Sequence, residues 1–428
     1  MIARTDQFVA ACTGGVGTGA GRPYRCGVHR RAIAVAAALL LAGVACSGGS
    51  QDRATTDASA TGSTDTTSIP GGIGYYRSPG TRPDMPPGTL VASEPLALEG
   101  LDGTGRRVTY SSTTPAGDTV HLTGVAILPT GVDPADPTPG SMPVAVWNHP
   151  TVGIGTECAP SSTEPFTIEG AQPLLDAGFV VMAPDYDGLG SEGVHPYLVL
   201  ESQGRAVIDI ARAAGELGGD GTVVTWGHSQ GGHAALSARA IVDRYAPALE
   251  LVAVAAASPP TDLSLFLNPG FTTSALLAVT AQTVVSWATV YTNTELETLG
   301  SPEALALAGE ALDSCVGDLA AAAAEREPAD VWARGPDDVP AWGTLTDVNS
   351  IDAAPGSAPV YLTHGGADAL VPLEGSDTLA SELCDQGAGV VYRSRPDWNH
   401  ATAYTDPLAD LVGWLIATAG GAPVQSTC

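Results

Sequence analysis

Residues 222–233 read Thr222-Val223-Val224-Thr225-Trp226-Gly227-His228-Ser229-Gln230-Gly231-Gly232-His233. A run rich in β-branched residues meets the motif Gly-x-Ser-x-Gly, and a run of helical composition, 234–245, follows it. Strand, tight turn and helix in succession predict a nucleophile elbow with Ser229 on the turn. Gly227 and Gly231 are the small residues that such a strained turn requires. The alternative is a glycine-rich turn before a helix, so the rest of the chain must supply what a reactive serine needs.

The surrounding sequence alternates between strand and helix patterns. Runs of strand composition are 107–113, 120–129, 143–149, 178–184, 222–228, 249–257, 358–365 and 389–394. Helical patterns are 201–217, 234–245, 375–384 and 407–417. This alternation predicts an α/β fold with a mostly parallel central sheet flanked by helices, and the hairpin 107–129 as its antiparallel edge.

The alternation stops between residues 262 and 355. Ala- and Leu-rich helical stretches fill this part without a convincing strand, and they are 273–290, 294–299 and 302–324. A sheet interrupted and later resumed predicts an inserted segment. We therefore expect one α/β domain over 86–428, with 262–355 as a helical cap inserted between the sixth and seventh core strands.

The first 46 residues have the features of an export signal. His29-Arg30-Arg31 precedes an uncharged apolar run, 32–45, which has signal-peptide length and is too short to span a bilayer comfortably. The run ends in small residues before Cys46, as in a bacterial lipobox, although Gly43 stands where leucine is usual. We expect export and membrane attachment through a lipidated Cys46. The alternative is ordinary signal cleavage and full secretion.

The composition of the remaining chain agrees with an exported protein. Residues 47–85 are Ser, Thr, Asp, Gly and Pro with few large apolar side chains, which predicts a disordered tether. A formal net charge of -28 argues against a nucleic-acid partner. Four cysteines lie beyond the leader, and their even number predicts two disulfides with three possible connectivities; they are Cys158, Cys315, Cys384 and Cys428. No cysteine or histidine spacing indicates a metal site.

A serine hydroxyl needs a neighbouring base, usually a histidine that a carboxylate orients. In the arrangement that the elbow predicts, the three groups follow one another in the order serine, acid, histidine. Of eight histidines, only His400 lies beyond the acidic residues near the late strand ends. Asp368 directly follows the strand 358–365, at the sheet edge where sites form, although a turn or helix-capping role is its alternative. The weaker candidates for the acid are Asp377, Asp385 and Asp397.

The oxyanion of an acyl-transfer intermediate needs preorganised N–H donors. We expect the backbone N–H of Gln230 to be one of them. The other is expected from the loop 149–153, in which Pro150 has no N–H. Thr151 is therefore the second predicted donor, and its hydroxyl is a further contact.

Several blocks beyond the elbow resemble the secretory lipase family of actinobacteria and fungi, within the α/β-hydrolase superfamily. These blocks are His149-Pro150-Thr151-Val152-Gly153, Cys158-Ala159-Pro160-Ser161, Ala183-Pro184-Asp185-Tyr186-Asp187-Gly188-Leu189-Gly190, residues 204–214, Ser258-Pro259-Pro260-Thr261-Asp262-Leu263, and the C-terminal block around Leu383-Cys384 ahead of His400. The resemblance covers residues from about 100 to 428.

The resemblance implies Ser229, Asp368 and His400 as a catalytic triad, and 262–355 as a cap over an acyl-binding tunnel. It also implies the disulfides Cys158–Cys315 and Cys384–Cys428. The chain departs from the family at Pro150, where glycine is usual, which affects the geometry of the oxyanion loop.

These features together predict an exported serine carboxylester hydrolase, a lipase or esterase that cleaves lipid or acyl esters without a metal or an organic cofactor. Its place would be the cell surface or the extracellular space. Peptide hydrolysis and acyl transfer use the same triad and remain alternatives. A non-catalytic binding lipoprotein anchored at the surface is the alternative of a different class. The sequence does not determine the oligomeric state.

Overall fold

The structure is a computed structural model of the 428-residue chain. It describes residues 85–267, 273–291, 294–327, 331–332, 334–353, 356 and 358–428. The predicted leader, the lipidation site Cys46 and residues 47–84 of the predicted tether lie outside the described residues. None of the described helices is long and apolar enough to cross a membrane.

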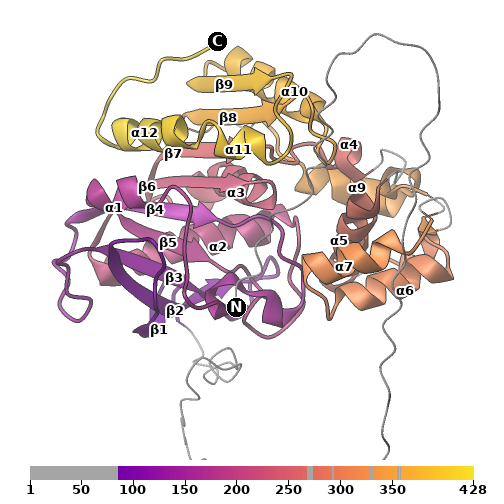
Figure 1. The fold of residues 1–428 in the computed structure, drawn as a ribbon, viewed down its shortest axis with the longest axis horizontal. Coiled ribbons are helices and arrows are strands. Elements are labelled where there is room, and N and C mark those ends of the chain that lie inside the picture. Colours follow the sequence, from indigo (N-terminus) through magenta and orange to yellow (C-terminus); the bar gives the residue numbers. More distant parts are fainter. Residues whose placement is uncertain are drawn as a thin grey trace, which may run out of the picture. The chain divides into compact units, whose positions relative to one another are not determined.

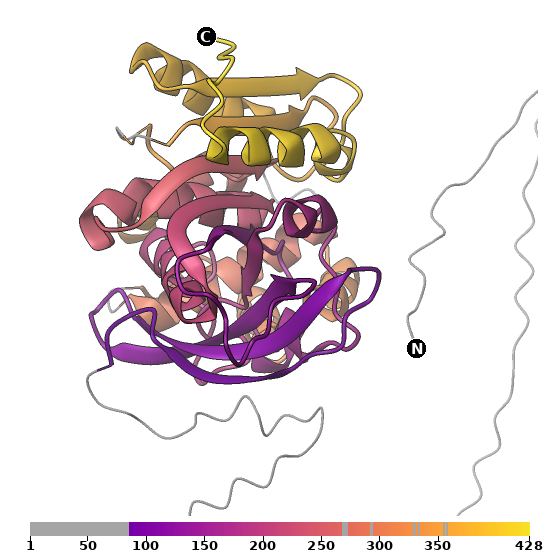
Figure 2. The ribbon, with the colours of Figure 1, turned by 90° about the vertical axis from the view of Figure 1, so that its left-hand side faces the viewer.

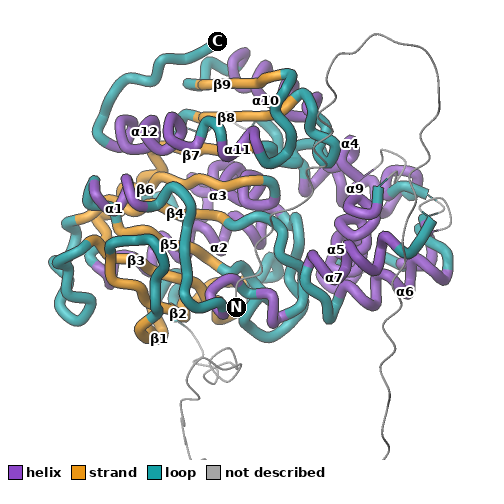
Figure 3. Tube along the Cα trace, viewed as in Figure 1, coloured by secondary structure: helices purple, strands orange, loops and turns teal. Residues whose placement is uncertain are grey.

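In the described part of the chain, nine strands form one mixed sheet in the order β1-β2-β3-β5-β4-β6-β7-β8-β9 (Figure 1; Figure 3). The strands are β1 Leu90–Pro95, β2 Gly103–Thr113, β3 Thr119–Pro129, β4 Met142–Asn148, β5 Val180–Pro184, β6 Gly219–His228, β7 Glu250–Ala257, β8 Val360–Gly365 and β9 Val390–Arg395. Neighbours pair antiparallel from β1 through β3 to β5, and parallel from β5 to β9. The predicted mostly parallel sheet with an antiparallel edge is confirmed.

The sheet is buried on both faces because its central strands are almost wholly apolar. Successive residues of β6 and β7 contribute alternately to two cores: Val223 and Val254 to one, Val224 and Ala255 to the other. Helices cover both faces; those outside the β7–β8 connection are α1 Gln172–Asp176, α2 Leu200–Ala213, α3 Gln230–Tyr245, α10 Leu373–Asp385, α11 Thr402–Thr405 and α12 Leu408–Ala419. Helices α2, α3 and α10 pack in the first core, and α1 and α12 in the second. Both ribbon views show β8, β9 and α12 at the end of the sheet away from β1 (Figure 2).

Helices also fill the long connection between β7 and β8. They are α4 Leu263–Leu267, α5 Ser274–Val290, α6 Pro302–Ala311, α7 Val316–Ala324 and α9 Pro340–Asn349. Their buried side chains form a third core, which also takes in Ile154 and Tyr197 from outside the connection. The connection was expected after the sixth strand but follows the seventh, since the sequence did not predict the edge strand β1. β1 is only half-buried and has a bulge after Leu90, and a strand of this kind need not show a clear alternation of apolar and polar residues.

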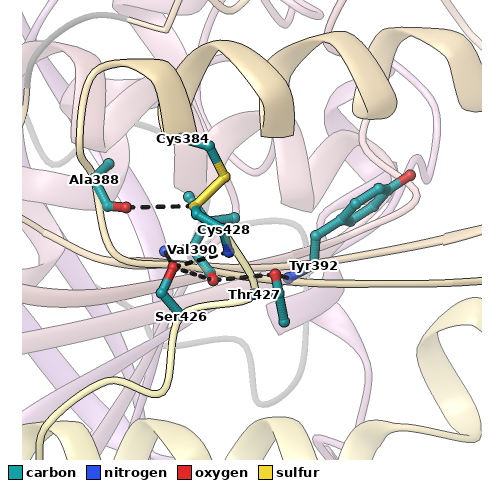
Figure 4. The surroundings of a disulfide bond; sticks show 7 residues. All are labelled: Cys384, Ala388, Val390, Tyr392, Ser426, Thr427 and Cys428. Atoms are coloured by element: carbon teal, nitrogen blue, oxygen red, sulfur yellow. Dashed lines mark hydrogen bonds between the residues drawn. A yellow bond between two sulfur atoms is a disulfide. The ribbon is translucent and has the colours of Figure 1, made fainter.

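Two disulfides tie distant segments together. Cys158–Cys315 joins the short 3-10 helix Thr156–Cys158 to the turn between α6 and α7. Cys384–Cys428 joins the end of α10 to the last residue, and the residues before Cys428 lie along β9 (Figure 4). There the Thr427 N–H donates to the Val390 carbonyl at 2.7 Å, so the C-terminal segment covers part of the outer edge of β9. These are the two pairs that the family resemblance implies.

Candidate active site

Ser229 occupies a strained turn between β6 and α3. Its backbone has φ 57° and ψ -120°, which a non-glycine residue rarely adopts. A Cβ on Gly227 would lie 2.3 Å from the Gly231 carbonyl group, and a Cβ on Gly231 would lie 2.0 Å from the Asn148 carbonyl oxygen. Both positions therefore require glycine. The Ser229 N–H donates to the Ala257 carbonyl at 2.8 Å, which ties the turn to the end of β7.

Asp368 and His400 meet at the same edge of the sheet. Asp368 follows β8, and His400 lies in the segment between β9 and α11. The His400 Nδ1 lies 2.7 Å from Asp368 Oδ2, and the Asp368 side chain is fully buried while that of His400 is 20% exposed. The other oxygen, Oδ1, accepts the N–H groups of Leu370 and Val371 at 2.9 Å each. These bonds fix the orientation of the carboxylate.

A second histidine, His364, touches the same carboxylate. Its Nε2 lies 3.4 Å from Asp368 Oδ2 and 3.1 Å from the Val371 carbonyl oxygen. Both neighbours are acceptors, so Nε2 carries the proton and Nδ1 accepts from the Ser376 hydroxyl at 2.7 Å. Burial raises the pKa of Asp368, but the hydrogen bonds from His364 and His400 outweigh it and hold this pKa well below its usual range. Asp368 is therefore ionised at neutral pH.

His228, the residue before the serine, holds the main chain of His400. Its Nε2–H donates to the His400 carbonyl at 2.8 Å, and the two ring centroids lie 4.6 Å apart. The His228 ring also stacks on Tyr404. Burial and the neighbouring His400 lower the pKa of His228 to about 4, so it is neutral at pH 7. This contact brings the elbow and the His400 segment together.

The two predicted oxyanion donors lie on either side of the elbow. Gln230 is the first residue of α3, where backbone N–H groups have no partner within the helix. Thr151 follows β4, whose last carbonyl, that of Asn148, packs against Gly231. The Thr151 hydroxyl lies 2.7 Å from the hydroxyl of Tyr197.

A cavity of about 230 Å³ connects these groups to the helices of the β7–β8 connection. Ser229, His400 and Thr151 line it together with mostly apolar side chains. The remaining lining residues are Pro150, Tyr197, His228, Phe266, Ala275, Ala278, Val279, Val316, Ala320 and Leu370. The structure thus brings together around one cavity three of the five predicted site residues, with Asp368 behind His400 and Gln230 next to Ser229.

Among the described residues, one cluster has the composition of a metal site, namely Glu157, Cys158 and Cys315. The two sulfur atoms are bonded to each other, so the cluster offers only a single carboxylate. Such a group does not hold a structural metal ion.

Three residues that contact the site are not among those predicted from the sequence, namely His195, Tyr197 and His364. His364 precedes Asp368 in the chain and is excluded by the order of a triad, yet it binds the same carboxylate. His364 lies on the buried strand β8, four residues before Asp368, and this spacing is a signal that could have indicated the contact. His195 and Tyr197 carry no comparable signal, because their partners come from segments far away in the sequence.

Comparisons with known proteins agree with this architecture. Residues 163–278 match the model of the secretory lipase family. Lipase 4 and Lipase 5 of Candida albicans are 40% and 39% identical to this chain over 83 residues. Each match covers 18% of this chain and only 17% of the relative's length.

Solved structures match over most of the chain. Candida antarctica lipase A has a TM-score of 0.67 at 17% identity, covering 80% of this chain and 84% of that one. The rice cell wall degrading esterase LipA from Xanthomonas oryzae has a TM-score of 0.64 at 22% identity, covering 78% and 98%. At these identities the likeness shows the fold, which is that of the α/β hydrolases. Residues 163–278, which include the elbow, are thus similar to the secretory lipase family, and the described chain shares the fold of the solved lipase and esterase structures.

Proposed function

We propose that this chain is an exported serine carboxylester hydrolase that cleaves lipid or acyl esters. The observation that carries the proposal is the strained Ser229 on the wall of an apolar cavity, beside a histidine bonded to a buried carboxylate. Nucleophile, base and orienting acid are the groups that acyl transfer requires, and each comes from a different strand end. A binding scaffold has no physical need for all three.

In this mechanism the Ser229 hydroxyl attacks the ester carbonyl while His400 Nε2 takes its proton. Asp368 accepts the hydrogen bond from His400 Nδ1, which keeps Nε2 unprotonated before the attack and stabilises the imidazolium afterwards. The N–H groups of Gln230 and Thr151 bind the oxyanion. His400 returns the proton to the departing alcohol, and water, activated by the same histidine, then releases the acid from Ser229.

The lining of the cavity favours an acyl chain as the group next to the reacting carbonyl. Alanine, valine, leucine and phenylalanine side chains make up more than half of its lining residues. Burial of methylene groups against such a wall lowers the free energy of binding, and the wall offers few hydrogen-bonding groups to a peptide. This favours an ester of a fatty acid over the alternative peptidase reaction.

Export is supported by the two disulfides, which persist in oxidising compartments. Attachment to a membrane through a lipidated Cys46 rests on the sequence alone. Metabolic labelling with a fatty-acid analogue tests it: we expect the label in wild type and not in Cys46→Ala. If the wild-type protein carries no label, lipidation is excluded and the alternative, signal cleavage followed by full secretion, is favoured.

The test of the catalytic proposal is Ser229→Ala assayed on p-nitrophenyl esters and triglycerides. We expect hydrolysis to fall by at least about a thousandfold, and fluorophosphonate labelling to disappear. Ser394→Ala, which changes an exposed serine on β9, is the control and keeps both. Peptide substrates and alcohol acceptors in the same panel test the peptidase and acyltransferase reactions. Wild-type protein that neither hydrolyses esters nor reacts with the fluorophosphonate would favour the binding lipoprotein.

A further inference from the structure

One short segment, residues 195–197, touches both predicted oxyanion donors. It lies between β5 and α2, and its side chains are almost fully buried. The His195 Nε2 lies 2.8 Å from the side-chain nitrogen of Gln230. The Tyr197 hydroxyl lies 2.7 Å from that of Thr151. The two donors come from different strand ends, and this segment is a contact that they share.

The direction of the His195 contact follows from its other nitrogen. Nδ1 lies 2.7 Å from the Asp187 carbonyl oxygen, which can only accept, so Nδ1 carries the proton. Nε2 therefore accepts from the Gln230 amide. Burial holds the pKa of His195 at about 3, so the ring stays neutral and this pattern persists over the working range of pH. The side chain of Gln230, whose backbone N–H is the predicted donor, is thus anchored from one side.

The Tyr197 contact bears on the hydroxyl of Thr151. Either hydroxyl can donate in this bond, but a phenol is more acidic than an aliphatic hydroxyl and is the stronger donor, which favours donation from Tyr197 to Thr151 Oγ1. The proton of Thr151 is then free to point into the cavity, which both residues line. A hydroxyl that accepts one hydrogen bond becomes a better donor of the next.

The main chain of the same segment is fixed by the cap helix α5. The Ser286 hydroxyl donates to the His195 carbonyl at 2.7 Å and accepts the Tyr197 N–H at 2.8 Å. The indole N–H of Trp287 donates to the Tyr197 carbonyl at 3.0 Å. Ser286 and Trp287 are fully buried. Three hydrogen bonds without access to water therefore link one turn of α5 to the segment that holds the donors.

We propose that His195 and Tyr197 are positioning residues that hold Gln230 and Thr151 in the oxyanion hole and couple both to helix α5. This inference rests on the proposed function, since an oxyanion hole has meaning only for acyl transfer. It makes the cap a determinant of the chemical step as well as of substrate binding. Loosening α5 would then lower kcat without any change in the triad.

A double-mutant cycle tests the Tyr197 arm. Tyr197→Phe removes only the hydroxyl, and we expect kcat on a short p-nitrophenyl ester to fall by about tenfold, with KM changed by less than about threefold. In a Thr151→Val background the same change should cost nothing further, whereas Thr151→Ser, which keeps a hydroxyl, should restore the sensitivity. Equal losses in all backgrounds, or an effect on KM alone, would overturn the proposal.

The cap arm uses two buried hydroxyls on the same helix. Ser286→Ala cuts two of the three links to the segment, and we expect kcat to fall by about five- to tenfold. Thr283→Val is the control, because Thr283 is equally buried and, among the residues that the structure describes, its hydroxyl bonds to the Val279 carbonyl of its own helix alone. It should keep the wild-type kcat, with melting temperatures measured for both variants. Equal kcat in the two variants would refute the coupling.

The outcomes separate this inference from the proposed function. If the wild-type protein does not hydrolyse esters, both the proposed function and this inference are wrong. If hydrolysis depends on Ser229 but the effects of the Tyr197 and Thr151 substitutions are additive and Ser286→Ala keeps the wild-type kcat, only the positioning role of residues 195–197 is wrong.

Discussion

Replacing Asp368 by asparagine should abolish the base without changing the size of the side chain. The asparagine oxygen has to stay on the side of the Leu370 and Val371 N–H groups, because an amide NH₂ there would face two donors. The new NH₂ therefore takes the place of Oδ2, 2.7 Å from His400 Nδ1. It donates to that nitrogen and forces the imidazole proton onto Nε2, which then cannot accept the proton of Ser229.

The wrong tautomer sets the size of the effect. Loss of the correct tautomer, with loss of the charge that stabilises the imidazolium, costs about 10⁴ in kcat, or roughly 5 kcal/mol of barrier. The new NH₂ also faces the proton on His364 Nε2, and an unsatisfied buried donor costs roughly 1–3 kcal/mol of stability. Since the pKa of Asp368 is lowered, the ionised carboxylate stabilises the fold above pH of about 4 and this contribution is lost on further acidification. The stability difference between wild type and variant should shrink accordingly.

The assay is kcat on a short p-nitrophenyl ester, with urea unfolding at pH 7 as the measure of stability. Asp397→Asn is the matched control. It lies three residues before His400, but its side chain is 69% exposed and pairs with Arg395. We expect it to retain activity within about twofold, as surface pairs contribute little. An Asp368→Asn variant with more than about a tenth of wild-type kcat would refute the reasoning, and a large loss in Asp397→Asn would move the acid there.

Three further substitutions test the packing of the elbow, the buried His233 and the disulfide Cys158–Cys315. Gly231→Ala places a Cβ 2.0 Å from the Asn148 carbonyl oxygen, so we expect a loss of at least about 1–3 kcal/mol in urea unfolding; unchanged stability would contradict the close packing. Burial lowers the pKa of His233 to about 4, so wild-type stability should fall by up to about 3 kcal/mol as pH drops from about 6.5 to 4, and His233→Gln, compared at pH 7 and 4.5, should lack this part of the loss. Cys158→Ser combined with Cys315→Ser opens a 157-residue connection, for which chain entropy sets an upper limit of about 5 kcal/mol, and thermal unfolding that is unaffected would show that the cap stays docked without it.

The sheet and the elbow could be predicted from the sequence because their signals are local. Runs of β-branched residues mark the buried strands, and two glycines mark the turn at Ser229. Features that depend on distant partners have no such local signal. Residues 302–324 were expected as one helical stretch, but they form α6 and α7, separated at Cys315. Cys315 is drawn to the core by its disulfide and by a backbone bridge to Gly153, which no local pattern indicates.

The candidate site divides in the same way. Asp368 and His400 follow from their order in the chain, and their side chains lie within a hydrogen bond of each other. The chain order serine, acid, histidine excludes His364 as the base, because His364 precedes Asp368. That order carries no information on the contact between the His364 ring and the Asp368 carboxylate. Pro150 is the residue at which the chain departs from the family pattern. The Pro150 carbonyl oxygen lies 2.7 Å from Nδ1 of the neighbouring His149, so the His149 side chain holds the loop that carries Thr151, although Pro150 has no N–H to donate.

Two different parts of the fold therefore position the two halves of the proposed chemistry. The helical β7–β8 connection lies between Ser229 and Asp368 in the sequence, yet it does not separate them, because parallel pairing of β7 with β8 places the carboxyl ends of both strands at the same edge of the sheet. The Ser258 N–H, at the end of β7, donates to the Thr363 carbonyl at 2.8 Å. A long insertion across such a fixed gap costs little extra entropy. The proposed triad thus depends on the register of the sheet, which is continuous from β7 to β8 despite the long connection.

The loop 149–153, which carries the proposed oxyanion donor Thr151, is in contrast bonded to the helical β7–β8 connection at Val152 and Gly153. The Val316 N–H of α7 donates to the Val152 carbonyl at 2.8 Å, and the Cys158–Cys315 disulfide closes the same contact. Substitutions at the start of α7, where it contacts this loop, should accordingly act on the proposed oxyanion binding. In the proposed enzyme, helix α7 would thus affect acyl transfer through this loop, while the sheet positions Ser229.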